Sequence, residues 1–207
     1  INFLKDGTGS RIGTVYISYQ FLDFYEVNPF PYAKLAYLLK GFRVRQLWIR
    51  PRILKDDIYQ IATPEILGNI DDFISISIQD VALNDPYNFL LFLSTQVGGI
   101  VLEQYNVVST SMGALNFYGV PNDQCPKLFL DMLSNKLENL TIQNRYNYDF
   151  INQNGINFLK ENVPLLNKKI YFSTITGRQP DGFKPNEYVH NGHRVKVSIT
   201  ALHIMPA

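Results

Sequence analysis

The side chains best suited to chemistry in this sequence are three histidines and a single cysteine. His190 and His193 stand three positions apart and His203 follows, and imidazole nitrogens can hold a metal ion. With only three histidines, two of them in an expected loop, we interpret all three as surface or core residues. A Cys–His dyad cannot be argued from Cys125, which stands directly before Pro126. The sequence therefore predicts no catalytic residue, no metal site, no cofactor and no enzyme activity.

Weaker patterns have ordinary explanations. The segment Gly7-Thr8-Gly9-Ser10 has small residues suited to phosphate, but a P-loop needs GxxxxGK[ST] between a strand and a helix. We interpret it as a loop. The paired acids Asp56-Asp57 and Asp71-Asp72 are typical of solvated turns. Asn139-Leu140-Thr141 is a glycosylation sequon, but no secretory leader accompanies it.

A basic cluster is the most suggestive feature for binding. Its members are Arg43, Arg45, Arg50 and Arg52. On a strand Arg43 and Arg45 share one face, and Arg50 lies on the other face with Val44 and Trp48. Arg43 and Arg45 are the candidate nucleic-acid contacts, because arginines can neutralise phosphates without reading sequence. The alternative is that they pair with carboxylates at the surface or at a subunit contact, and Trp48 is expected in the core.

Composition limits the class of protein. The chain has 207 residues, 46% of them hydrophobic, 14% aromatic and 18% charged, with a net charge of +1. That is enough for one well-buried domain spanning 1–207, and the near-neutral charge is not that of a basic nucleic-acid binder. One cysteine excludes an internal disulfide framework and suits a reducing compartment. Without a run of about 18 apolar residues, no membrane insertion is expected.

The elements that must position these residues are mostly strands. Alternating, β-branched and aromatic runs predict strands at Arg11–Phe21, Phe42–Ile49, Asp72–Val81, Ile100–Ser109, Lys169–Thr176 and Arg194–Met205, with a further short strand at Ala114–Val120. Helical spacing predicts a short helix over Lys127–Leu137, and Phe89–Leu93 is open between strand and helical turn. Long loops are expected at Lys55–Asn69, Asn144–Asn157 and Arg178–Gly192.

This element order predicts an antiparallel eight-stranded jelly-roll sandwich with one or two short helices. The absence of a βαβ rhythm argues against a parallel sheet. Unequal loops between strands fit a jelly roll better than a meander of tight hairpins.

The order of strands resembles the jelly-roll capsid proteins of circovirus-like, Rep-encoding single-stranded DNA viruses and related small icosahedral viruses. The segments that carry the resemblance are VYISYQF, YAKLAYLLKGF, RVRQLWIRP, DDFISISIQDVALNDPYNFLLFL, KIYFSTITG and HRVKVSITALHIM. It is a likeness of element order and residue type. The arginine-rich N-terminal arm of that family is absent, and because the chain opens at Ile1 we expect a missing upstream segment to carry it.

The resemblance implies a viral coat protein in the virion. Copies of the chain would self-assemble into an icosahedral shell around a small, single-stranded DNA genome, held mainly by the missing basic arm. A host receptor is a further possible partner. The alternative is a carbohydrate- or receptor-binding β-sandwich module with loop aromatics Tyr146, Tyr148 and Tyr188 at its site.

Overall fold

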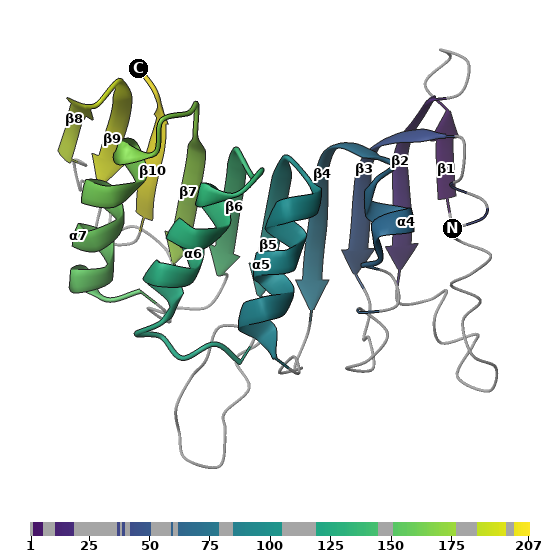
Figure 1. Ribbon diagram of the computed structural model, residues 1–207, viewed down its shortest axis with the longest axis horizontal. Helices are drawn as coiled ribbons and strands as arrows, with labels where there is room; N and C mark the ends of the chain where they lie inside the picture. Colours follow the sequence, from purple (N-terminus) through teal and green to yellow (C-terminus); the bar gives the residue numbers. More distant parts are fainter. Residues whose placement is uncertain are drawn as a thin grey trace.

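In the computed structural model the described residues form one sheet with helices against it (Figure 1). The residues that the structure describes are 2–5, 11–18, 37, 39, 42–50, 59, 62–78, 85–104, 119–144, 151–176, 186–197 and 201–207. The described part of the chain contains no helix that is both long enough and apolar enough to span a membrane.

The sheet has ten strands in the order β1-β2-β3-β4-β5-β6-β7-β10-β9-β8. Their bounds are β1 Asn2–Lys5, β2 Arg11–Ser18, β3 Arg43–Arg50, β4 Ile70–Ile78, β5 Gly99–Gln104, β6 Asn139–Asn144, β7 Tyr171–Thr176, β8 Asn186–His190, β9 His193–Val197 and β10 Ala201–Pro206. From β2 to β7 each strand pairs in parallel with the next in the chain. β1 and the group β10, β9 and β8 pair antiparallel at the two ends.

The described helices all lie on one face of this sheet (Figure 1). They are α4 Pro64–Leu67, α5 Pro86–Gln96, α6 Cys125–Ser134 and α7 Gln153–Asn162, and α7 continues into the 3-10 turn η1 Val163–Leu165. Parallel neighbours need a connection that returns the chain to the same edge, and helices in these connections pack back onto the sheet. Strand-and-connection units stacked in chain order are the arrangement of a solenoid.

The prediction of a mostly β protein is confirmed, but the jelly roll is not, because the sheet is mixed. The argument against a parallel sheet is wrong. It depended on the absence of a strand–helix rhythm, and that rhythm was hidden because α5 reads as a short apolar run and α7 begins in an Asn-rich segment. The expectation of one or two helices is therefore also too low.

The core lies between the sheet and these helices. Leu140 and Ile142 of β6 are fully buried, and the intervening Thr141 is not, which is the alternation of a strand covered on one face. The ring of Phe129 on α6 lies 6.2 Å from that of Phe172 on β7. Burial of such large side chains against the sheet supplies the main driving force for this packing.

The helices follow local signals of different strength. The helix predicted over Lys127–Leu137 is confirmed as α6, which begins at Cys125. The segment Phe89–Leu93, open between strand and helix, lies within α5. The expected loop Asn144–Asn157 is wrong at its end, where α7 begins at Gln153. There the Asn152 side chain accepts a hydrogen bond of 3.0 Å from the backbone N–H of Gly155 and caps the helix.

The expected loop Arg178–Gly192 is also wrong at its end. It contains β8, which is joined to β9 by the two-residue turn Asn191-Gly192 with φ of 44° and 70°. Positive φ at both positions is the geometry that the Asn-Gly pair favours in hairpins. The long strand predicted from Arg194 to Met205 is two antiparallel strands, β9 and β10.

Candidate binding surface

The face of the sheet opposite the described helices carries the outward side chains, and we call it the open face. The strand register lines up two rows of side chains across it. The first row contains Gln46, Phe73, Asn139 and Tyr171, and the second contains Trp48, Ser75, Val101, Thr141, Ser173 and His203.

The first row contains two aromatic side chains, Phe73 and Tyr171, and the second begins with Trp48. Trp48 and Phe73 meet edge to face with ring centres 5.9 Å apart, and the indole N–H donates to Gln46 Oε1 at 3.1 Å. On the neighbouring strand β5, Gly99 leaves room for the Phe73 side chain, because a Cβ at position 99 would lie 2.9 Å from the Cβ of Phe73. Tyr171 is 52% exposed. The face therefore offers flat apolar area beside amide groups.

Trp48 occupies this face by simple alternation along β3, since it is two residues from Gln46, whereas Leu47 between them is fully buried. The register with β4 shifts between Val44 and Gln46, and the extra residue belongs to β4, whose matching partners are Ile70 and Phe73. Trp48 is half-buried beside Phe73 rather than in the fully buried core where it was expected.

Hydroxyl groups lie along the second row, in which Ser75 is fully buried, and the imidazole of His203 ends it. Ser173 Oγ lies 2.9 Å from His203 Nδ1, in a hydrogen bond whose donor depends on the imidazole tautomer. Burial, and then the charge of Lys196, lower the pKa of His203 below its ordinary value. His203 is therefore neutral at pH 7. Its charged neighbour is a lysine rather than the carboxylate that would orient a catalytic base, so the pair is suited to hydrogen bonding a ligand.

Charged pairs lie on the strands near the two ends of the two rows. Arg43 pairs with Asp71, and Arg45 Nε lies 3.0 Å from Asp72 Oδ2, at the start of β3 and β4. At the other end of the sheet Arg194 of β9 lies 3.5 Å from Glu187 of β8. The structure shows the alternative interpretation of Arg43 and Arg45, in which both pair with surface carboxylates. Both arginines stay more than half exposed, and contact with nucleic acid stays a prediction.

The other residues singled out from the sequence do not converge. Among the described residues there is no group of three His, Cys, Asp or Glu side chains able to hold a metal. Burial, and secondarily the charge of Asp123, raise the pKa of the Cys125 thiol to about 12, so the thiol is not reactive at neutral pH. Tyr188 is half-buried on β8, whereas Tyr146, Tyr148, Gly7–Ser10 and Asp56-Asp57 lie outside the described residues.

The open face was missed because its strands were not recognised as a repeated set. Two segments share the pattern L-x-x-L-x-L that is typical of strands in leucine-rich solenoids. They are Val97, Ile100 and Leu102 around β5, and Leu137, Leu140 and Ile142 around β6. All six side chains are buried, whereas Val101, Asn139 and Thr141 between them are not. This spacing was the available signal, and it also marks β6, which was not predicted.

Comparison of the chain with protein-family models, with curated proteins and with solved structures gives no match.

Proposed function

We propose that this chain is a binding module that recognises a protein partner through the open face. One observation carries the proposal: the described centre of that face is aromatic and polar, and charged pairs lie on the strands near its two ends. Protein interfaces have this anatomy, with charges depleted at the core and placed at the rim. Within the described centre the acidic Glu103 is buried, 6% exposed, and adds little surface charge.

The extent of the face favours a protein over a small ligand. Row two crosses β3, β4, β5, β6, β7 and β10 in continuous register. Neighbouring strands are about 4.8 Å apart, so this row is roughly 24 Å long. Solenoids use such extended sheet faces to contact whole domains. A glycan would occupy a part of it, and the aromatic Trp48–Phe73 corner is the part suited to a sugar ring.

This proposal retains the receptor-binding alternative that the sequence suggested, on a different scaffold. The capsid hypothesis stays a prediction. Its support was an order of strands expected to fold as an antiparallel sandwich, and the parallel register of β2 to β7 does not provide that support.

Site-directed photo-crosslinking in the native source or host cell tests the proposal. A photoreactive phenylalanine analogue at Tyr171, on the open face, should give one discrete protein adduct. The same analogue at Phe158, 37% exposed on α7, is the matched control on the helix side and should not give that adduct. The Asn139→Arg variant, which places a charge beside Tyr171, should abolish the adduct.

Three results separate the possibilities. The same adduct from Tyr171 and Phe158 would refute a specific open face. Adducts only with further copies of the chain would favour self-assembly and return attention to a shell. Loss of adduct after glycosidase treatment of the partner would assign the face to a glycan.

A further inference from the structure

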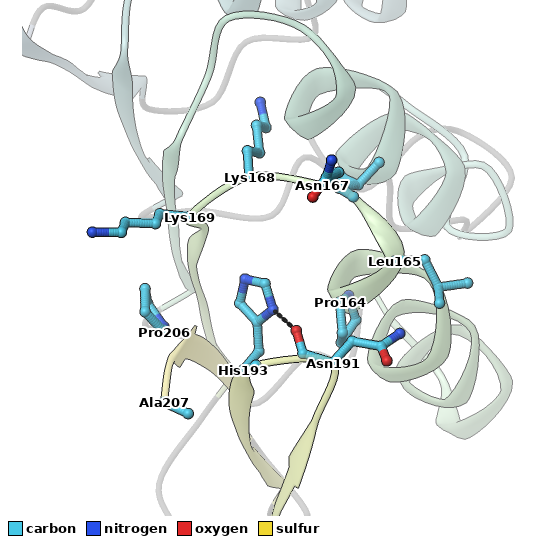
Figure 2. A pocket seen from close by; sticks show the side chains of 11 residues that line it. Pro164, Leu165, Asn167, Lys168, Lys169, Asn191, His193, Pro206 and Ala207 are labelled. Atoms are coloured by element: carbon cyan, nitrogen blue, oxygen red, sulfur yellow. Dashed lines mark hydrogen bonds between the residues drawn. The ribbon is translucent and has the colours of Figure 1, made fainter.

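A separate pocket lies at the edge of the sheet, away from the two rows of the open face. It has a volume of about 630 Å³ and opens where β7 begins, beside the β8–β9 turn and the end of β10. Its walls include Pro164, Leu165, Leu166, Lys168, Lys169 and His193 (Figure 2). This volume is in the range of pockets that hold small molecules.

His193 is the side chain in this pocket whose hydrogen bonding is incomplete. It is 6% exposed, and Figure 2 shows its ring pointing into the space between Lys168, Lys169 and Pro206. Nδ1 lies 3.0 Å from the backbone carbonyl oxygen of Asn191. Because a carbonyl only accepts, Nδ1 carries the proton and the tautomer is fixed. Nε2 is buried and has no hydrogen-bond partner among the described residues.

The position of this ring is set by the backbone around it. His193 is the first residue of β9, directly after the Asn191-Gly192 turn, and pairs with Pro206 of β10. Ala207 donates its backbone N–H to the carbonyl of Gly192 at 2.9 Å, which ties the turn to the end of β10. Nε2 is therefore held in place before any ligand arrives, so binding costs little ordering of this side chain.

The charge of the pocket indicates the sign of the ligand. Lys168, Lys169 and His193 line it, and no described lining residue is an aspartate or glutamate. Lys168 is fixed by hydrogen bonds of 2.6 and 2.7 Å to the carbonyls of Asn135 and Leu137, so its charge acts from the wall. Lys169 is exposed and points away from the pocket in Figure 2, so its long side chain is free to turn toward a bound anion.

We propose that this pocket binds a small organic anion, with a phosphate or carboxylate group accepting a hydrogen bond from Nε2 of protonated His193. The apolar remainder of the molecule packs against Leu165 and Leu166, of which Leu165 is 61% exposed in the free protein. Charge-assisted hydrogen bonds of this kind are about twice as strong as neutral ones, and lysines add attraction. The site is independent of the open face.

The charged and titratable groups nearest His193 suit an anion. Lys168 and Lys169 precede β7, and His190 lies across the turn on β8. All three are neutral or positive. None of them repels an anion in the pocket.

Nuclear magnetic resonance of the histidine side chains tests this with defined probes. Phenyl phosphate and benzoate carry the two anionic groups on one apolar body, and benzyl alcohol is the uncharged control. At pH 6 we expect saturable shifts of the His193 ring with at least one anion and none with benzyl alcohol. The stronger of the two anions assigns the ligand as a phosphate or a carboxylate.

Two variants complete the test. His193→Gln should weaken binding about tenfold or more, whereas His190→Gln, which removes the neighbouring imidazole outside the pocket lining, should leave it within about twofold. Lys169→Gln should weaken binding several-fold without touching the core, which covers the case in which His193→Gln fails to fold. The proposal is overturned if neither anion gives saturable shifts, if benzyl alcohol binds equally, or if His193→Gln binds as well as the wild type.

Discussion

Tyr171 and Phe172 are adjacent aromatic residues on β7, and the structure places them on opposite faces of the sheet. Phe172 is 1% exposed and contacts Phe129 of α6, whereas Tyr171 is 52% exposed on the open face. The same replacement by alanine at both positions therefore measures the difference between the two faces. The two positions share one strand and are adjacent in the sequence, so the pair is internally controlled.

For Phe172→Ala the loss is a buried ring plus the cavity it leaves, about 3–5 kcal/mol. For Tyr171→Ala it is mainly strand propensity and partial burial, about 1 kcal/mol or less. Domains are stable by about 5–15 kcal/mol in total, so the first change removes a large share. With a urea slope of about 2–3 kcal/mol per molar, the midpoint should fall by roughly 1.5 M for Phe172→Ala and by less than about 0.5 M for Tyr171→Ala.

Urea titration followed by circular dichroism measures both midpoints, and the fluorescence of the single tryptophan provides an independent probe of two-state unfolding. Equal, large losses for the two variants would refute the reasoning. That result would mean that Tyr171 is covered by another layer, as in a sandwich, and that the open face is not available to a partner.

Three further predictions concern single groups. Because burial raises the pKa of Cys125 to about 12, a thiol reagent at pH 8 should react with the native protein only at the rate of unfolding, and rapid stoichiometric labelling would contradict this. Gly192→Ala, at φ of 70° with nothing near its Cβ, should cost about 1 kcal/mol in urea unfolding, while Gly192→Asn should cost less because asparagine tolerates this region. Burial alone would raise the pKa of Asp131, but hydrogen bonds from Lys127 and Tyr87 lower it below 3.8. The folded pKa is thus depressed, so Asp131→Asn should destabilise the protein at pH 7, and the difference should shrink as pH falls through that pKa; an equal loss at pH 3 would contradict it.

Local features of the sequence predicted much of the secondary structure. β2, β3, β4, β5 and β7 were found from alternation and β-branched or aromatic content, and α6 from its apolar spacing. Each depends on side chains within one segment, which is why the sequence suffices. The Asn191-Gly192 turn belongs in the same class, since its φ preference is local and was overlooked rather than hidden.

Strand direction was not predictable in that way. Whether β4 and β5 pair parallel or antiparallel depends on how the segment between them returns, and that segment contains α5, whose apolar residues fit a strand or a helix equally. The same holds for α7, whose helix begins at a capping Asn152 inside a polar stretch. Tertiary burial decided both helices, and the helices decided the sheet.

For the candidate sites, too, the sequence determined some features and the tertiary structure decided others. The sequence by itself determined that Arg43 and Arg45 lie on a strand and that Cys125 has no disulfide partner within the chain. Only the tertiary structure decided that these arginines meet Asp71 and Asp72, that Trp48 packs against Phe73, and that His193 lines a pocket with two lysines. The reason is physical: propensity and charge belong to a residue, whereas its partners are set by strand order and register between segments far apart in the chain.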